Sequence, residues 1–289
     1  MTSPQTSPRT TPETTLVFGH KSPDTDSTGS AIAWAWFLAH QGIPAEPRLL
    51  GEPNTEAAFV LRHWGLAKPP VIADVTAADR VVIVDTNNPA ELPPSINEAR
   101  IAAIIDHHML VGGLRTPATI EVTIRPLACT ATVMADLMGP HLGHAPRAIR
   151  GVMLSCILSD TLEFRSPTTT PHDRAVAEAL ARDLGVSIPE LAAAQFEAKS
   201  DVSAHTEAEL LRMDSKEYTI AGHELRVSVL ETTSPAVILR RKAALMAAIR
   251  CCSSSSTSCA RRRRCWCPTP SSRRWPKPPS ASGSRATAW

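Results

Sequence analysis

Four short segments of this sequence group histidine and aspartate side chains closely enough to bind divalent metal ions. The first is GHKSPDTDS at residues 19–27, which places His20, Asp24 and Asp26 within seven residues. Mixed imidazole and carboxylate ligands suit ions such as Mn²⁺ better than ions that prefer thiolates. The alternative is that Asp26 or Ser27 caps the following helix, so this segment favours a metal site without establishing one.

The other three segments follow apolar runs. Asp85 comes after VVIV at residues 81–84, DHH at residues 106–108 follows IAAII, and Asp160 lies in the SDT sequence after residues 151–158. Taken singly, each of these segments could be a turn or the end of a helix. Together with the first segment they supply a set of six candidate metal ligands, namely His20, Asp24, Asp26, Asp85, His107 and Asp160.

Six such ligands are enough for two ions. The ions could share Asp85, with His20 and Asp24 on one ion and a second set, Asp26, His107 and Asp160, on the other. Two ions about 3.5–4 Å apart hold a water molecule, lower its pKa and direct it at a phosphorus atom. The adjacent His108 points in a different direction from His107 and could face a ligand.

Alternating strands and helices are predicted to position these segments. Residues 15–19, 81–84 and 101–105 are short apolar runs typical of buried strands, and helical patterns cover residues 27–40, 128–138, 151–158 and 171–184. Strands that alternate with helices predict an α/β fold with a mainly parallel sheet. Ligands bind such sheets beyond the carboxyl ends of the strands, so the candidate ligands should meet along one edge.

A smaller, incomplete α/β unit is predicted to follow. A helical connection is expected at residues 188–201, a helix at 205–213, a hairpin of residues 218–220 and 225–230, and another helix at 235–249. We therefore predict an N-terminal extension at residues 1–14, a metal-binding domain at 15–190, a linker at 191–202, a partial substrate-binding domain at 203–250 and a tail at 251–289.

The tail differs from the rest of the chain in composition. Residues 251–289 contain serine and arginine runs, five of the seven cysteines, eight basic residues and no acidic residue, so the first 250 residues carry a formal charge of about −6 against +2 for the whole chain. The tail could be a basic nucleic-acid-binding segment or a zinc knuckle, but no cysteine spacing matches a zinc site. We favour a disordered segment or the product of a frameshift.

Composition also bounds location and partners. The whole-chain charge of +2 suggests neither a nucleic-acid nor a membrane partner. The N-terminus lacks the apolar stretch of a secretory signal, and no apolar run reaches the length of a membrane helix. We therefore expect a soluble, cytoplasmic protein.

The motifs GHKSPDTDS, VVIVD, DHH and SDTL, in this order, resemble those of the DHH phosphoesterases. They look most like the family II, manganese-dependent inorganic pyrophosphatases, over about residues 15–249, and LRMDSKEY at residues 211–218 resembles that family's substrate-lysine segment. The resemblance implies a DHH domain followed by a DHHA2-like domain. It also implies that the six ligands bind two Mn²⁺ (or Co²⁺) ions, that His108 and Lys216 contact the phosphates, that Mg²⁺ accompanies the substrate, and that a homodimer forms through the N-terminal domain.

The implied activity is hydrolysis of inorganic pyrophosphate to two phosphates by a water molecule activated by two Mn²⁺ ions. The family also carries an Arg-Lys-Lys motif near its C-terminus, which grips the electrophilic phosphate, and here the tail replaces that stretch. Arg240, Arg241 and Lys242 lie in the helix before it and are not given that role. We therefore predict impaired activity.

Two alternatives to this activity remain open. One is another DHH phosphoesterase, acting on oligonucleotides, cyclic dinucleotides or polyphosphate, although the only nearby glycine pair, Gly112 and Gly113, does not match the glycine-rich motif of those relatives. The other is an inactive, metal-binding remnant.

Overall fold

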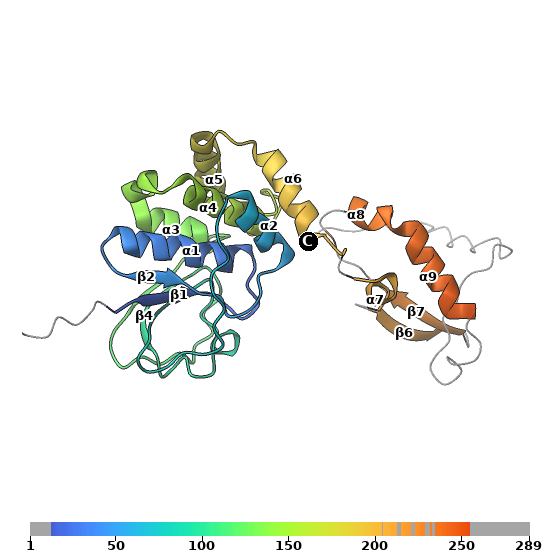
Figure 1. Cartoon of the computed structure of the whole chain (residues 1–289), viewed down its shortest axis with the longest axis horizontal. Helices are drawn as coiled ribbons and strands as arrows, with labels where there is room; N and C mark the ends of the chain where they lie inside the picture. Colours follow the sequence, from blue (N-terminus) through green and yellow to red (C-terminus); the bar gives the residue numbers. More distant parts are fainter. Residues whose placement is uncertain are drawn as a thin grey trace, which may run out of the picture. The chain divides into compact units, whose positions relative to one another are not determined.

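The computed structural model describes residues 13–203, 205–212, 215–220, 223–228, 232 and 235–254 (Figure 1). The chain divides into two compact units, one of residues 1–201 with 232–235 and the other of residues 202–231 with 236–289. Among the helices in the described part of the chain, none is long and apolar enough to cross a membrane.

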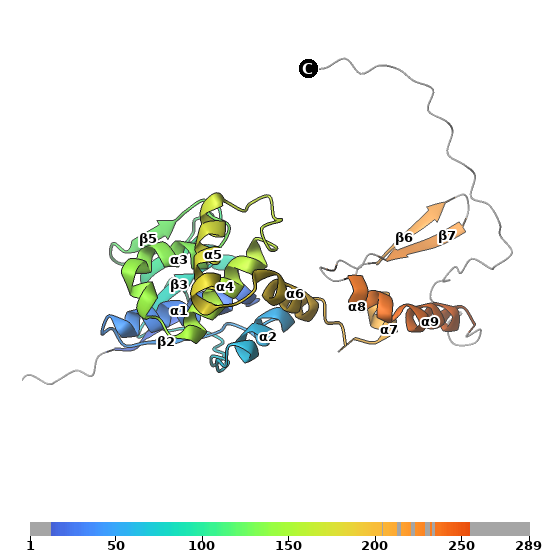
Figure 2. The same ribbon diagram turned by 90° about the horizontal axis from the view of Figure 1, so that it is seen from above.

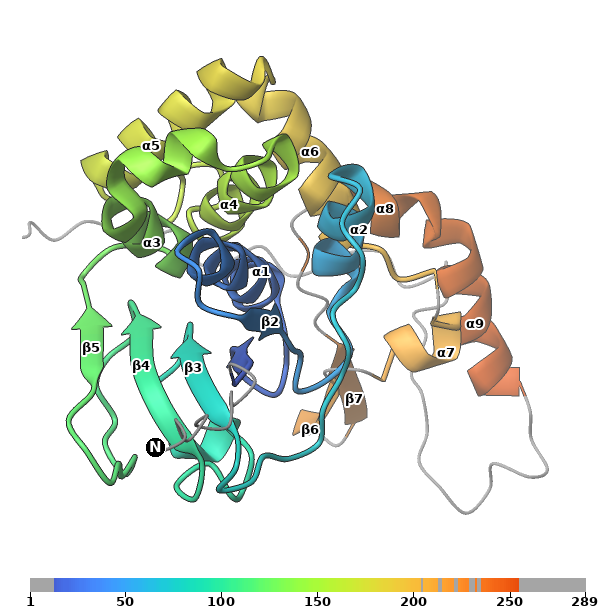
Figure 3. The same ribbon diagram turned by 60° about the vertical axis from the view of Figure 1, so that its left-hand side comes forward.

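The first unit is built on a five-stranded parallel sheet with the strand order β2-β1-β3-β4-β5. Figure 3 shows β3, β4 and β5 side by side. This confirms the predicted α/β fold with a mainly parallel sheet. The strands are β1 (Thr15–Phe18), β2 (Ala45–Pro47), β3 (Arg80–Val84), β4 (Arg100–Asp106) and β5 (Glu121–Ile124).

Side chains of the central strands alternate between two apolar cores. Val82 and Val84 of β3 pack into the core that the helices share, whereas Val81 and Ile83 pack into a smaller core on the other face. Because both faces are buried, the strand is apolar at every position from residue 81 to residue 84 rather than alternating. The helices of this unit are α1 (Thr25–His40), α2 (Thr55–His63), α3 (Thr130–Met138), α4 (Arg147–Asp160), α5 (Pro171–Leu184) and α6 (Ile188–Lys199), with short 3₁₀ helices η1 (Pro89–Glu91) and η2 (Gly139–His144).

Local sequence signals explain where several of these helices begin and end. Asp24 caps α1 by accepting a hydrogen bond from the Ser27 N–H at 3.0 Å. Helix α5 coincides with the predicted helix at residues 171–184; it begins with a capping box between Thr170 and Asp173 and ends at Gly185, whose φ is 63°. Helix α4 runs two residues past the predicted end at residue 158, so Asp160 is its last residue.

The second unit contains α7 (Glu207–Leu210), an antiparallel hairpin of β6 (Ser215–Ile220) and β7 (His223–Ser228), α8 (Pro235–Arg240) and α9 (Lys242–Ser254) (Figure 2). The predicted hairpin is confirmed, although β6 begins three residues and β7 two residues earlier than predicted, and residues 229 and 230 lie outside the described residues. Helix α7 is shorter than the helix predicted at residues 205–213. Helix α9 continues four residues into the segment predicted as a tail. Residues 1–12 and 255–289, which include most of the predicted extension and most of the predicted tail, lie outside the described residues.

The single helix predicted at residues 235–249 is wrong, because the chain breaks it at Arg241. The Arg241 guanidinium donates hydrogen bonds to the Val202 and His205 carbonyl oxygens, both at 2.7 Å, and to Glu207 Oε1 at 2.8 Å. These contacts tie the break between α8 and α9 to the segment around α7. They also satisfy hydrogen-bond donors of the guanidinium with acceptors from its own unit.

Close packing of α1 on α4 gives a first testable prediction. A Cβ atom at Gly29 would lie 2.3 Å from Cys156 Sγ and 3.0 Å from Val152 Cγ2, both on α4. We expect Gly29→Ala to lower the free energy of unfolding by about 1–3 kcal/mol through overpacking, measured by urea denaturation. Gly143→Ala is the matched control because a Cβ there meets nothing within 4 Å; equal stability of the two variants would contradict the prediction.

Candidate metal centre

The order of the strands fixes where a site can form. From β1 the chain passes through α1 to β2 on one side of β1, and then through α2 to β3 on its other side. Ligands of open parallel sheets bind at such a switch point, beyond the carboxyl ends of the strands. His20 follows β1, Asp85 follows β3, and His107 follows β4, the next strand along.

Asp85 lies at the middle of this arrangement. Its side chain is buried, and its backbone has φ 59°, a left-handed conformation that costs energy for a residue other than glycine and often marks functional sites. His107 Nε2 lies 3.4 Å from Asp85 Oδ1, and His20 Nε2 lies 3.5 Å from Oδ2. Burial alone would raise the pKa of Asp85, but these two imidazoles hold it well below its usual range.

Asp26 is held by the start of another helix. Its Oδ2 accepts a hydrogen bond from the Thr130 N–H at 2.6 Å, and its Oδ1 accepts from Ala131 N–H at 3.2 Å and Ser30 Oγ at 2.8 Å. Thr130 and Ala131 open α3, so the carboxylate occupies the positive end of that helix. Burial and the negative charge of Asp85 nevertheless raise the pKa of Asp26 to about 6.

Asp160 completes a group of neighbouring carboxylates. Its Oδ2 is buried and has no hydrogen-bond partner within the part of the chain that the structure describes. Burial, followed by the negative charges of Asp26 and Asp85, raises the pKa of Asp160 well above its usual value. An unpartnered buried carboxylate oxygen beside two other carboxylates is an arrangement that a cation would stabilise.

The two histidines present a ring nitrogen to these carboxylates. His107 Nδ1 lies 3.1 Å from the Leu127 carbonyl oxygen, which can only accept, so Nδ1 donates and Nε2, which faces Asp85, is the nitrogen that can exchange its proton for an ion. Burial would lower the pKa of both imidazoles. The neighbouring carboxylates have a larger opposite effect on these pKa values than burial has. Asp24 and Asp85 raise the pKa of His20 to about 10, and Asp85 and Asp26 raise that of His107 to about 9.

All six predicted ligands come together in space. His20, Asp24 and Asp85 form one group and Asp26, His107 and Asp160 form a second; within each group the ligand atoms lie within 4.8 Å of one another. A third group, Asp85, His107 and His108, is equally compact. Oxygen and imidazole nitrogen donors with excess negative charge fit a divalent ion such as Mn²⁺. That these six residues act as metal ligands remains a prediction.

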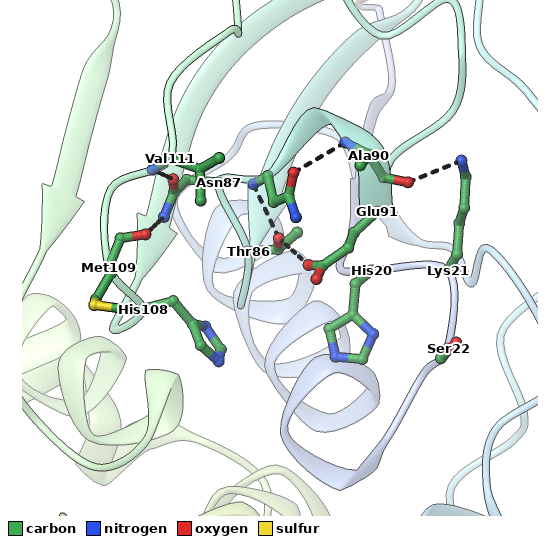
Figure 4. A pocket seen from close by; sticks show the side chains of 11 residues that line it. His20, Lys21, Ser22, Thr86, Asn87, Ala90, Glu91, His108, Met109 and Val111 are labelled. Atoms are coloured by element: carbon green, nitrogen blue, oxygen red, sulfur yellow. Dashed lines mark hydrogen bonds between the residues drawn. The ribbon is translucent and has the colours of Figure 1, made fainter.

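Two neighbouring cavities give access to these groups. The smaller, about 210 Å³, is lined by Asp24, Asp85, His107, His108, Ala128, Asp160 and Thr168. The larger, about 600 Å³, is lined by residues of the loops after β1, β3 and β4, and His108 borders both cavities. Figure 4 shows the rings of His20 and His108 at the larger cavity, together with Lys21, whose Nζ donates to the Ala90 carbonyl oxygen at 3.3 Å.

Sequence reasoning missed the residues that hold these ligands in place. Asp106 is fully buried; its Oδ1 accepts from the backbone N–H groups of His107 and His108 at 2.7 and 3.1 Å and lies 2.8 Å from His108 Nδ1. Asn87 Nδ2 donates to Asp106 Oδ2 at 2.6 Å. Membership of the DHH triplet could have indicated Asp106, but nothing in the sequence points to Asn87.

Lys216 is the one predicted site residue that the geometry does not place. Its backbone lies on β6, and its side chain falls outside the described residues. Its contact with a phosphate remains a prediction.

Comparisons with known proteins agree with this fold and these motifs. Residues 14–159 match the DHH family, N-terminal domain, and residues 193–258 match the DHHA2 domain. A Deinococcus radiodurans protein is 40 % identical over 228 residues, which cover 77 % of this chain and 72 % of that protein, and one from Lactobacillus acidophilus is 35 % identical, with 74 % and 68 % covered. Both are named as probable manganese-dependent inorganic pyrophosphatases.

A solved structure is similar as well. The crystal structure of a Methanococcus jannaschii protein, titled a putative family II inorganic pyrophosphatase, has a TM-score of 0.63 and 32 % sequence identity, and the match covers 81 % of this chain and 78 % of that one. The fold and the motifs therefore define a DHH-family protein with a DHHA2 domain. Within that class, the chain belongs to the manganese-dependent inorganic pyrophosphatases, and the predicted family is confirmed.

The unpartnered oxygen of Asp160 gives a second prediction. Each Mn²⁺ at about 100 times its Kd should stabilise the protein by about 2.7 kcal/mol, and we expect Asp160→Asn to remove most of the gain that comes from the ion beside Asp160. Stability without metal should not fall, because the substitution removes a carboxyl group from a site crowded with others. Thermal unfolding with and without Mn²⁺ measures both effects.

Asp183→Asn is the control for this experiment, because Asp183 is an exposed carboxylate on α5 that pairs with Arg150. It should keep the full gain from Mn²⁺. A full gain in Asp160→Asn as well would remove Asp160 from the proposed ligands.

Proposed function

We propose that the chain hydrolyses inorganic pyrophosphate to two phosphates and that the six candidate ligands hold two Mn²⁺ ions for this reaction. The observation that supports it most strongly is the pairing of two compact ligand groups, His20–Asp24–Asp85 and Asp26–His107–Asp160, beside one another at the switch point of the sheet. The names of the relatives support the substrate and the metal. Replacement of Mn²⁺ by Co²⁺, Mg²⁺ bound with the substrate, and a homodimer remain predictions.

The chain's own residues would prepare this site before any ion binds. Asp85 lies within 3.5 Å of one ring nitrogen from each group, so it is placed to serve both ions. Leu127 fixes the tautomer of His107, and the start of α3 orients the Asp26 carboxylate. When bound, two such ions would lower the pKa of a water molecule and offset charge on the phosphates.

His108 is the residue best placed to contact substrate. Its side chain is 53 % exposed and borders both cavities, and its Nδ1 faces the Asp106 carboxylate, which leaves Nε2 for a ligand. Hydrogen bonding to Asp106 raises the pKa of His108. A protonated imidazole there would bind a phosphate oxygen and could donate its Nε2 proton to the departing phosphate.

We further propose that turnover is impaired. The resemblance implies an Arg-Lys-Lys motif near the family's C-terminus that binds the electrophilic phosphate. No such motif occurs after Arg250 in this sequence. The matching DHHA2 region ends at residue 258. Arg241 cannot replace this motif, because its guanidinium is already hydrogen-bonded to Val202, His205 and Glu207.

Phosphate release from pyrophosphate tests the activity. With Mn²⁺, we expect the 289-residue chain to release phosphate at least about 100-fold more slowly than the Deinococcus relative assayed beside it, because each missing stabiliser of transition-state charge costs about 10²–10³ in rate. Asp85→Asn should abolish the release, and Asp183→Asn should leave it unchanged.

Other results would change the proposal. A rate equal to that of the relative would show that the missing motif is dispensable. Faster release from polyphosphate or from a dinucleotide than from pyrophosphate would favour another DHH phosphoesterase. No release from any of these substrates, with Mn²⁺ still bound, would leave an inactive metal-binding protein.

The role of His108 can be separated from that of a ligand. If His108 contacts substrate, His108→Gln should lower kcat/KM for pyrophosphate about 100-fold or more and leave the Kd for Mn²⁺ unchanged. His172→Gln is the control, because His172 lies on the surface and pairs with Asp136. A weaker affinity for Mn²⁺ in His108→Gln would instead support the third ligand group, in which His108 itself binds an ion.

A further inference from the structure

Three histidines meet on the surface at the far end of α1. His40 is the last residue of that helix, and His141 and His144 lie on η2. One ring nitrogen from each lies within 4.8 Å of the others, and all three side chains are exposed. Since α1 begins at the metal centre and rises about 1.5 Å per residue, its 16 residues place this group about 20 Å from the candidate ligands in its first turn.

The local backbone explains how three distant residues converge. A 3₁₀ helix has three residues per turn, so side chains at positions i and i+3 lie one above the other. His141 and His144 have this spacing in η2, and their ring centroids are 6.3 Å apart. The His40 ring lies 5.5 Å from that of His141 and 5.9 Å from that of His144.

Aromatic side chains of α1 orient these rings. Trp36, one turn before His40, stacks on it with centroids 5.1 Å apart and an angle of 15° between the planes. The Phe37 ring meets His141 edge to face at 6.0 Å. Contacts of this kind restrict the rotamers of His40 and His141, which lowers the entropy lost when the rings bind a common ligand.

We propose that His40, His141 and His144 form a second metal site, which binds one late first-row divalent ion such as Zn²⁺ or Ni²⁺. Three imidazole nitrogens are a sufficient protein ligand set for such an ion, with water in the remaining position. The group contains no carboxylate, so it disfavours Mn²⁺, which binds nitrogen ligands more weakly than Ni²⁺ or Zn²⁺ does. The site thus differs from the metal centre in position, in ligands and in the ion it selects, and it does not depend on the proposed function.

Counting bound Ni²⁺ tests this site in the whole protein. The full chain, saturated with Mn²⁺ and with its solvent-accessible thiols alkylated in the folded state, is dialysed against increasing Ni²⁺; Cys129 and Cys156 are buried and stay unmodified. We expect the wild type to bind one more Ni²⁺ than His141→Gln and His144→Gln do. The affinity for that ion should fall at least about 100-fold in each variant, since loss of even an outer-sphere partner costs about 10- to 100-fold.

His63→Gln is the matched control, because His63 is exposed on α2 and outside the group. It should bind as many Ni²⁺ ions as the wild type does. Any Ni²⁺ that replaces Mn²⁺ at the metal centre is counted equally in all four proteins, so the difference among them reports the histidine group alone.

Trp36 provides a second, local measurement. Paramagnetic Ni²⁺ bound at His40 should quench the fluorescence of the stacked indole, whereas diamagnetic Zn²⁺ should not. We expect the quenching by Ni²⁺ to disappear in His141→Gln, because the ion no longer binds. In Trp36→Phe the quenching should also disappear, but Ni²⁺ should still bind. Equal Ni²⁺ binding by the wild type and both histidine variants would overturn the proposal, as would binding that leaves Trp36 fluorescence unchanged.

Discussion

Repulsion among three aspartates at the carboxyl edge of the sheet is the constraint on which the rest of this structure depends. Asp26, Asp85 and the Oδ2 atom of Asp160 are buried close together, where like charges are poorly screened. The fold offsets the negative charges of the first two aspartates. The start of α3 and the Ser30 hydroxyl donate hydrogen bonds to Asp26, and two imidazoles lie against Asp85. The Oδ2 atom of Asp160 has no hydrogen-bond partner among the described residues, so this carboxyl must either keep a proton, as its raised pKa indicates, or bind a cation.

Placing these carboxylates requires close packing of helices as well as the order of the strands. Helix α1 begins one residue before Asp26, and α4 ends at Asp160, so the start of one helix must meet the end of the other. The missing side chain at Gly29 allows Cys156 to approach, and the Cys156 thiol donates to the Thr25 carbonyl oxygen at 3.2 Å. The glycine thus links core packing to the positions of Asp26 and Asp160 at the candidate metal centre.

Much of this could be predicted from the sequence because the signals are local. The run VVIV followed by Asp85 predicts a buried strand with a ligand at its end, and the four motifs indicate the six candidate ligands. Strands β2 and β5 and helix α2 were not predicted: β2 has three residues and ends in Pro47, and β5 is half exposed, so their pairing depends on neighbouring strands rather than on their own pattern. The role of Asn87 and the cluster of His40 with His141 were not predicted for the same reason, because contacts between residues far apart in the sequence produce no local sequence pattern.

The candidate metal ligands and the positive charge that turnover would require lie in different parts of this chain. Every candidate ligand lies between residues 20 and 160, inside one compact unit with its own core, so ion binding by these residues would require only that this unit folds. This unit offers few positive groups to an anionic substrate, chiefly Lys21 and the histidines that border the cavities. Neutralising a tetra-anion requires more positive charge than that, and the next group predicted to contact the phosphates, Lys216, lies in the DHHA2 region. Changes beyond residue 201 should therefore alter catalysis while leaving the affinity for the metal intact.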